Sequence, residues 1–351
     1  MSKESLRGAI IGCGKVAGNF HLPAWRKMKE VKIVAVCDNV IEAAAQTARQ
    51  WHIPSIYDDV SEMLGKESLD FVDICTPPPS HCQLAMQAMR NGLHVLIEKP
   101  MAMNLIEADE MIRIAKDAKV NICIVHNHLF NPVVQKAKIL LKKGIIGDFM
   151  AVDIHCCLGV RHLTRQSDWC HALPMGMFSD FIPHPLYLIH FFLGEIFSVN
   201  GILGKNSQYP WVAFNELLVL RKGSQGIGSF SILCNSRNDL FTVDIYGTDG
   251  ILQVDLFTQI VICRRHRSQK LKHLVLDRLE LLLPVIAASG TGIMYQIKKI
   301  KRSRIGHQVL MRLFINSLLN ETLPSVSGED GRENIRIRED LWRQIQIAEK
   351  S

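Results

Sequence analysis

Two residues near the middle of the chain have the types and the spacing for proton transfer at an alcohol carbon. Asp180 and His184 lie four residues apart within the segment 177–184, a spacing that places both side chains on one face of a helix. A histidine that titrates near neutral pH can take or return a hydroxyl proton while a hydride leaves the same carbon. An aspartate beside it can bind a substrate hydroxyl or orient the ring. The pair is equally consistent with a capping aspartate and a packed histidine.

A lysine follows a short apolar stretch earlier in the chain. The segment Glu98-Lys99-Pro100 comes directly after His94–Ile97, whose apolar residues predict a buried strand. A lysine at the end of such a strand can bring a charged donor to a reacting oxygen, and Pro100 fixes the local backbone. A solvated lysine after a strand would give the same pattern.

A glycine-rich turn predicts a dinucleotide site. Gly12, Gly14 and Gly18 follow the predicted strand Leu6–Ile11 and open a helix. The first glycine permits a tight turn, the second lets backbone approach a pyrophosphate, and the third allows close helix–strand packing. Lys15 and Val16 lie within this turn, where the first N–H groups of a helix attract phosphate. The alternative is a plain glycine turn between packed elements.

Asp38 bears on which dinucleotide is bound. It ends the second predicted strand, twenty residues after Gly18, and no lysine or arginine occupies the next three positions. A carboxylate there accepts hydrogen bonds from both ribose hydroxyls and repels a 2′-phosphate, so the sequence predicts NAD over NADP. Further cofactor contacts are expected from the strand-end segments 76–81 and 98–99, at Thr76, Pro77, His81, Glu98 and Lys99.

The elements that must position these residues fall into two groups. Before residue 128, short apolar runs alternate with helical patterns, as in a doubly wound parallel sheet. The predicted strands are Leu6–Ile11, Val31–Cys37, Phe71–Cys75, His94–Ile97 and Ile122–Val125, and the predicted helices are Ile41–Trp51, His81–Asn91 and Leu105–Ala118. Longer strand-like runs follow, at 149–157, 216–221, 226–233, 240–246 and 251–257, with a hairpin signal at Thr248-Asp249-Gly250. We therefore expect an α/β domain over 1–127 and an α+β domain with a mostly antiparallel sheet over 128–351.

The charge of the chain is concentrated in one segment. The formal net charge is +7, and residues 264–304 hold eleven of the Lys and Arg residues against two acidic ones. The remainder is slightly acidic, so a general affinity for nucleic acid is not expected. Within this basic insert, residues 281–297 carry no charge. The insert is consistent with contact to an anionic membrane surface, a subunit contact or a lid over the active site.

Ten cysteines are spread along the chain, several within apolar runs. In a chain of this length they are expected to be free thiols in a reducing compartment, and we predict a cytoplasmic location. The spacings of His155, Cys156, Cys157, His162 and Cys170 match no familiar zinc pattern, so no metal is expected.

The motifs together resemble the glucose–fructose oxidoreductase/inositol dehydrogenase (Gfo/Idh/MocA) family. The matching segments are GCGKVAGNFHLPA at 12–24, TPPPSH at 76–81, GLHVLIEKPMA at 92–102, HNHLFNP at 126–132, GIIGDF at 144–149, DFIPH at 180–184 and VSGEDG at 326–331. The resemblance implies a Rossmann domain followed by a domain whose open sheet makes an oligomer interface, hence a dimer or tetramer. It also implies that Lys99, Asp180 and His184 are the catalytic residues.

The resemblance further implies an NAD-dependent dehydrogenase or reductase that acts on a sugar, a nucleotide sugar or a cyclitol. Asn127, His162 and Trp169 are expected to contact this substrate together with Asp180 and His184. Two departures concern the substrate contacts: Leu129 and Tyr187 stand where the family commonly has Arg and Asp. Two other functions remain open, a redox-neutral NAD-dependent cleavage of glycosides and an NAD-binding regulator without turnover.

Overall fold

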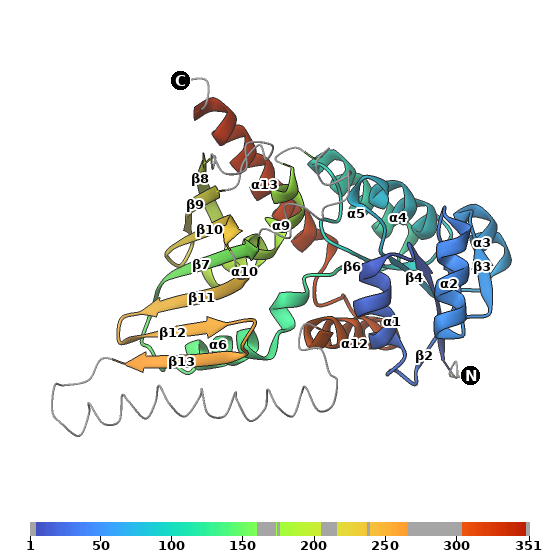
Figure 1. Cartoon of the computed structure of the whole chain (residues 1–351), viewed down its shortest axis with the longest axis horizontal. Coiled ribbons are helices and arrows are strands. Elements are labelled where there is room, and N and C mark those ends of the chain that lie inside the picture. The colour runs from blue at the N-terminus through green and yellow to red at the C-terminus, as the bar shows by residue number, and fades with distance from the viewer. Residues whose placement is uncertain are drawn as a thin grey trace. The chain divides into compact units, whose positions relative to one another are not determined.

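A computed structural model describes residues 5–159, 173, 176–204, 216–236, 239–265 and 304–348. The chain forms two compact units (Figure 1). The first unit comprises Met1–Asn127 and Arg304–Arg336, and the second comprises His128–Ser303 and Ile337–Ser351. The division after Asn127 lies where the sequence placed a domain boundary, but residues 304–336, expected in the second domain, pack with the first. Most of the basic insert, 266–303, lies outside the described residues.

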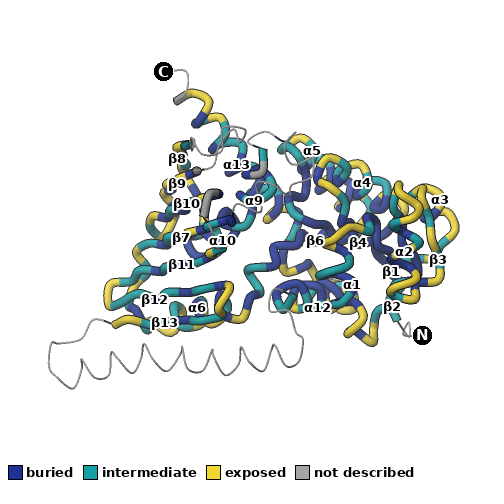
Figure 2. Tube along the Cα trace, in the orientation of Figure 1, coloured by how far each residue is buried: buried dark blue, intermediate teal, exposed yellow. Residues whose placement is uncertain are grey.

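The first unit is a doubly wound parallel sheet with strand order β3-β2-β1-β4-β5-β6. Its strands are β1 (Leu6–Ile11), β2 (Val31–Cys37), β3 (Ser55–Tyr57), β4 (Phe71–Ile74), β5 (His94–Ile97) and β6 (Ile122–Ile124). The carboxyl ends of parallel strands share one edge, and the order reverses between β1 and β4, which is where ligands bind in such sheets. Figure 2 shows that the central strands are buried, as the continuous apolar runs predict.

Helical segments surround this sheet. They are η1 (Ala17–His21), α1 (Leu22–Trp25), α2 (Ile41–Trp51), α3 (Val60–Lys66), η2 (Pro78–Ser80), α4 (His81–Arg90), α5 (Leu105–Ala118) and α12 (Ile305–Leu319). Helix α5 begins after Asn104, whose side chain accepts the N–H of Glu107 at 2.9 Å, while the Glu107 carboxylate accepts the N–H of Met103. This reciprocal capping fixes the helix start.

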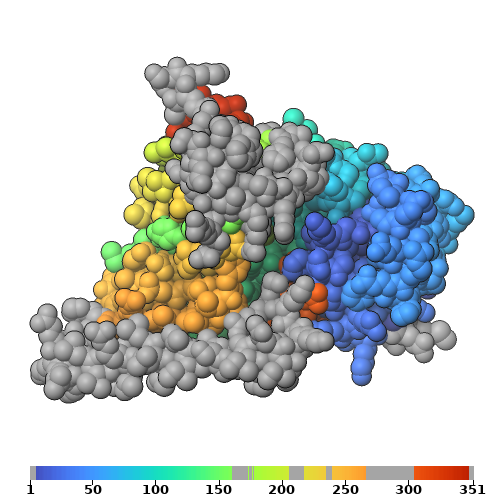
Figure 3. Space-filling model, in the orientation of Figure 1, coloured from blue at the N-terminus to red at the C-terminus, as the bar shows by residue number. Residues whose placement is uncertain are grey.

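Helix α12 belongs to the first unit because it buries its apolar face there. Leu310 and Phe314 are fully buried, and the Phe314 ring meets Phe71 of β4 at 5.8 Å between centroids. The helix also packs beside α1, and Figure 3 shows its surface next to that of the N-terminal elements. Helix α13 (Gly328–Ala348) is shared, with its residues up to Arg336 in the first unit.

The second unit contains a seven-stranded mixed sheet of order β13-β12-β11-β7-β10-β9-β8. Its strands are β7 (Phe149–Gly159), β8 (Ile196–Gly204), β9 (Glu216–Gly223), β10 (Ile227–Ser236), β11 (Leu240–Gly247), β12 (Gly250–Asp255) and β13 (Ile260–Arg265). β7 and β10 pair in parallel and the other neighbours are antiparallel, which confirms the expected mostly antiparallel sheet. β11 and β12 form the hairpin predicted at 248–250.

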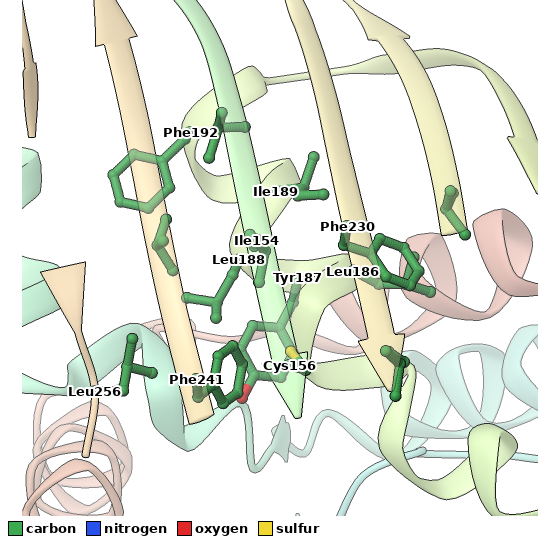
Figure 4. Packing of buried hydrophobic residues seen from close by; sticks show 14 of the residues in the cluster. Ile154, Cys156, Leu186, Tyr187, Leu188, Ile189, Phe192, Phe230, Phe241 and Leu256 are labelled. Atoms are coloured by element: carbon green, nitrogen blue, oxygen red, sulfur yellow. The ribbon is translucent and has the colours of Figure 1, made fainter. Parts of the chain in front are cut away.

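One face of this sheet is covered by helices. The helices are η3 (Asn127–Phe130), α6 (Pro132–Lys142), α9 (Met177–Phe181) and α10 (Pro183–Leu193). Figure 4 shows α10 side chains such as Leu186, Ile189 and Phe192 lying against the strands, where Ile154 and Phe230 belong to the same buried cluster. Alternate strand residues point away from this core, and among the described residues those of β7, such as Asp153 and His155, are half-buried or exposed. No helix among the described residues is long and apolar enough to span a bilayer.

Candidate functional site

Gly12 occupies a position that only glycine can fill without strain. Its φ is +94°, and a Cβ there would lie 2.8 Å from the carbonyl carbon of Cys75 and 2.8 Å from the nitrogen of Thr76. The turn after β1 is therefore pressed against the end of β4, at the point where the strand order reverses. This is the tight turn expected of a dinucleotide loop.

The Asp38 carboxylate closes the same loop. One oxygen accepts the N–H of Cys13 at 2.7 Å and the other accepts the N–H of Val40 at 2.9 Å. Each carboxylate oxygen has two lone pairs, so both retain acceptor capacity for ribose hydroxyls. The loop thus holds a negative charge at the end of β2, where an adenosine ribose binds in such folds.

The other residues of the glycine motif are exposed or open. Gly14, Lys15 and Val16 are exposed, so the backbone that is expected to meet the pyrophosphate is accessible. A Cβ on Gly14 or on Gly18 would meet nothing within 4 Å. The close helix–strand packing expected at Gly18 is therefore not found among the described residues, since a side chain there would meet open space.

The segment after β4 is tied to the segment after β5 by a buried histidine. His81 is fully buried, and its Nδ1 and Nε2 lie 2.8 Å from the carbonyl oxygens of Pro100 and Thr76. Burial lowers its pKa, although both carbonyls oppose this. Thr76 is half-buried and Pro77 is exposed. His81 thus holds together the segment after β4 and the segment after β5. From the sequence, His81 was predicted to be a cofactor contact.

Glu98 and Lys99 directly follow β5, at the same edge of the sheet. The buried Glu98 accepts the N–H of Lys99 at 3.2 Å through Oε2 and lies 2.9 Å from His21 Nε2 through Oε1. Lys99 is half-buried, and its peptide bond to Pro100 is cis. Asn127, predicted to contact substrate, is buried at the start of η3.

The sequence missed His21 and Asp73, which complete this buried arrangement. His21 Nδ1 lies 2.9 Å from Asp73 Oδ2, and both residues are fully inaccessible to solvent. The available signal was Asp73 itself, an acidic residue inside an otherwise apolar strand. Such a group is expected to have a buried partner.

Asp180 and His184 belong to the second unit, at the α9–α10 junction. Ile182 between the two helices keeps helical dihedrals (φ −49°, ψ −36°), and its N–H donates to Phe178 at 2.7 Å. Pro183 stands in the first turn of α10, where a missing N–H has no consequence. Pro183 therefore does not break the helical path from Asp180 to His184, and the side chains of Asp180 and His184 are half-buried.

His184 lies among aromatic rings and bonds to a tyrosine. Its Nδ1 is 2.8 Å from the hydroxyl of Tyr187, and the rings of His128 and Phe181 meet its ring edge-to-face at 4.8 and 5.4 Å. The N–H of His128 donates to the same hydroxyl at 3.2 Å. The hydroxyl oxygen has a second lone pair, so it can also accept the N–H of His184 Nδ1. From the sequence, Tyr187 was recognised only as a departure from the family pattern, and no contact with His184 was predicted.

The remaining predicted substrate contacts, His162 and Trp169, lie outside the described residues, as does Cys170. His155, Cys156 and Cys157 are on β7. The described cysteines are free, as expected, and burial raises the pKa of Cys13 to about 12.

Two family models match the chain, one in each unit. The first, described as an oxidoreductase family with an NAD-binding Rossmann fold, matches residues 6–126. The second, the GFO/IDH/MocA C-terminal domain, matches residues 134–253.

Curated relatives and solved structures agree with these matches. A D-apiose dehydrogenase from Paraburkholderia graminis is 37% identical over 41% of this chain, and the match spans only 38% of that protein. A myo-inositol 2-dehydrogenase from Thermotoga maritima is 22% identical over 93% of this chain and 92% of its own. The WlbA dehydrogenase from Bordetella pertussis, solved with NADH and UDP-GlcNAcA, has the same fold, with a TM-score of 0.81, 19% identity and coverage of 99% and 97%.

Proposed function

The chain belongs to the Gfo/Idh/MocA family of NAD-binding oxidoreductases, and on this premise we propose that it transfers a hydride between NAD and a secondary alcohol or ketone of a sugar, nucleotide sugar or cyclitol. The named relatives support this substrate class, since they act on D-apiose and myo-inositol. The single observation that carries the proposal is the Gly12–Asp38 loop, which combines a tight backbone turn with a ribose-binding carboxylate.

The glycine loop, Asp38 and the three predicted catalytic residues each have a role in this reaction. NAD supplies the hydride acceptor when bound, and Gly12, Gly14, Lys15, Val16 and Asp38 hold it. Lys99 donates a charged hydrogen bond to the reacting oxygen, which lowers the cost of developing negative charge there. His184 takes the hydroxyl proton during oxidation and returns it during reduction. Asp180 binds a neighbouring substrate hydroxyl.

The orientation of His184 suits it to act as a base. When the Tyr187 hydroxyl accepts the N–H of Nδ1, the lone pair of the ring is on Nε2, where it can take a substrate proton. A neutral tyrosine adds no negative charge, so it does not favour the imidazolium in the way a carboxylate would. His184 can therefore accept the substrate proton at Nε2 while the Tyr187 hydroxyl keeps the ring oriented.

The proposal is tested with the full chain and a panel of pentoses, hexoses, cyclitols and nucleotide sugars. NADH formation is followed by absorbance and fluorescence, with wild type, Lys99→Ala and, as a matched control, Lys66→Ala, an exposed lysine of the same unit. We expect one substrate class to give NADH with wild type and the control but not with Lys99→Ala. Equal turnover by Lys99→Ala would contradict the assignment.

The panel also separates the two other functions. Redox-neutral cleavage of a glycoside releases a sugar without net NADH, which chromatography of the products detects. An NAD-binding regulator shows NAD binding by calorimetry and no product with any member of the panel. Either result would replace the dehydrogenase assignment.

We also propose that the protein is a homo-oligomer that uses the outer face of the seven-stranded sheet. Ile202 and Leu220 are 69% and 54% exposed on neighbouring strands, and Ile227 is 61% exposed on β10. Leu220 and Ile227 line a hollow of about 440 Å³ on this face. Exposed apolar area of this kind marks a subunit contact. Light scattering should show a dimer or tetramer that dissociates in Leu220→Lys but not in Ile106→Lys, an exposed control in the first unit.

The cytoplasmic location and the membrane-surface contact of residues 264–304 remain proposals. The described cysteines are free and several of them are buried, and a reducing compartment keeps cysteines in this state. Co-sedimentation with vesicles containing anionic lipid, at low and high salt, tests the contact. Salt-sensitive binding would support it, and equal recovery with neutral vesicles would contradict it.

A further inference from the structure

A group of ionisable side chains lies buried beneath Lys99 and has no part in the chemistry proposed above. His21 of η1 stands between Asp73 of β4 and Glu98 of β5, with His307 of α12 alongside. His21 Nδ1 is 2.9 Å from Asp73 Oδ2 and 3.0 Å from Oδ1, and Nε2 is 2.9 Å from Glu98 Oε1. His21 and Asp73 have no solvent exposure.

The geometry determines how many protons the histidine carries. A neutral imidazole has one N–H and one lone pair, so one of its nitrogens would face a carboxylate oxygen without a proton between them. Two N–H groups satisfy both carboxylates, and Asp73 also accepts the indole N–H of Trp25 at 2.7 Å, as an ionised carboxylate does. Both contacts are hydrogen bonds to ionised carboxylates only when His21 carries a proton on each ring nitrogen.

Other groups around His21 agree with this charge arrangement. Cys75 lies beside Asp73 at 3.6 Å, and burial raises the pKa of its thiol, so it stays neutral. His307 Nε2 is 3.9 Å from the Glu98 oxygen that faces His21, and its ring is edge-on to His21 at 5.6 Å. Burial opposes ionisation of Glu98, but the hydrogen bond and charge of His21 lower the pKa of Glu98 to about 2.

The second oxygen of Glu98 connects this buried charge to the candidate active site. It accepts the N–H of Lys99, two residues after the end of β5, at 3.2 Å. A carboxylate whose other oxygen is held by a charged donor has little freedom to rotate. The backbone of Lys99 is thereby held from one side by Glu98, while His81 holds the Pro100 carbonyl at 2.8 Å from the other.

We propose that His21, as an imidazolium held between Asp73 and Glu98, positions Lys99 for catalysis through the Glu98 carboxylate. His21, Asp73 and Glu98 are positioning residues, since they act through the Lys99 backbone. The inference rests on the proposed function insofar as Lys99 acts on substrate. Its charge arrangement is independent of any reaction.

The first experiment measures the charge of His21 in the full-length protein. Histidines labelled with ¹³C in the ring are titrated by NMR, and the His21 signal is identified by its loss in His21→Gln. We expect an imidazolium shift that does not change between pH 6 and pH 9, because both carboxylates favour the charged form. A neutral imidazole shift, or one equivalent of a divalent metal in the purified protein, would overturn the proposal.

The second experiment separates positioning from general stability. Glu98→Gln keeps the shape and an acceptor for the Lys99 N–H but removes the charge that holds His21. We expect kcat to fall on the order of 10- to 100-fold, as for a small displacement of a reacting group, while the Kd for NAD stays within about twofold. The His21 signal should then titrate at a lower pH than in wild type. Glu62→Gln, which removes an exposed carboxylate from a surface ion pair, is the matched control and should change neither quantity.

The outcomes distinguish the two proposals. Wild-type kcat in Glu98→Gln, with Lys99→Ala inactive, would refute positioning and leave the proposed function intact. Full turnover by Lys99→Ala would refute the proposed role of Lys99, while the NMR titration would still decide the charge of His21. Equal losses of kcat and thermal stability in every variant, with no change in the His21 titration, would reduce the network to a structural role.

Discussion

Replacing Tyr187 by phenylalanine tests how His184 is oriented. The tyrosine is 4% exposed, and its hydroxyl joins the N–H of His128 at 3.2 Å to Nδ1 of His184 at 2.8 Å. Phenylalanine keeps the ring packing but removes the hydroxyl that bonds both to the N–H of His128 and to Nδ1 of His184. A buried polar group left without its partner costs roughly 1–3 kcal/mol. The lower part of this range is expected, because His128 and His184 are only half-buried.

The activity should fall by more than the stability suggests. Without the hydroxyl, the ring of His184 can rotate and change tautomer, so the fraction in the reactive orientation decreases. A general base typically contributes ~10²–10⁴-fold to the rate, and we expect Tyr187→Phe to lose on the order of 10-fold in kcat. Tyr187→Asp restores an acceptor for Nδ1–H but adds charge, which favours the imidazolium. The acidic limb of kcat/KM for oxidation should therefore move to higher pH in Tyr187→Asp.

The assay is NADH formation across pH 5–10 with the substrate found in the panel, together with thermal unfolding. Tyr57→Phe is the matched control, since its hydroxyl bonds to Glu67 at 3.1 Å, away from His184. A Tyr187→Phe variant that is less stable but retains wild-type kcat and pH dependence would refute the orienting role. The same limb position in Tyr187→Asp and wild type would refute the charge argument.

Three further predictions concern the first unit. Gly12→Ala should lower the melting temperature and weaken NAD binding. At φ +94° a Cβ would lie 2.8 Å from backbone atoms, a strain of about 1–3 kcal/mol. Unchanged NAD affinity, measured by calorimetry, would contradict the turn geometry. Asp38→Ala should raise the Kd for NAD about tenfold or more and reduce the preference for NAD over NADP. The reason is that it removes a carboxylate that accepts two backbone N–H groups and repels a 2′-phosphate. An unchanged ratio of the two Kd values would contradict this role of Asp38. The free energy of unfolding should fall as pH decreases from 4.5 towards 2, because the folded pKa of Glu98, about 2, lies below its ordinary value. It should also fall as pH rises through the pKa of His21, which Asp73 raises well above 6.5 although burial lowers it. Denaturant unfolding measured across this pH range tests both decreases in the free energy of unfolding. Glu98→Gln should make the decrease at acidic pH smaller.

The sequence predicted most of the first unit because its strands are short, apolar and separated by clear turn residues. β1, β2 and β5 and helices α2 and α5 have the expected bounds. β3 and α3 were missed, since three residues such as Ser55–Tyr57 carry too little pattern to recognise. In the second unit β8 and β13 were missed, and the parallel pairing of β7 with β10 depends on tertiary packing that no local pattern encodes.

The candidate site was predictable only where a motif is local. Gly12 and Asp38 lie within one strand–turn–helix–strand unit, and the structure gives both the expected geometry. The His21 network was missed because its partners lie 52 and 77 residues away along the chain. Such contacts become visible only when β4 and β5 are placed beside each other.

The assignment of residues 304–336 to the first unit has a consequence for synthesis of the protein. The core of that unit includes Phe314, and His307 lies against its buried charges. A ribosome releases residues 1–127 long before α12 emerges, so the nascent first unit lacks part of its core while residues 128–303 of the second unit are being made. Nascent chains generally fold from the N-terminus onward, one domain at a time. Here the first unit needs residues 304–336 and the second needs residues 337–351, so neither unit is expected to complete its folding until the last helix, α13, has been synthesised.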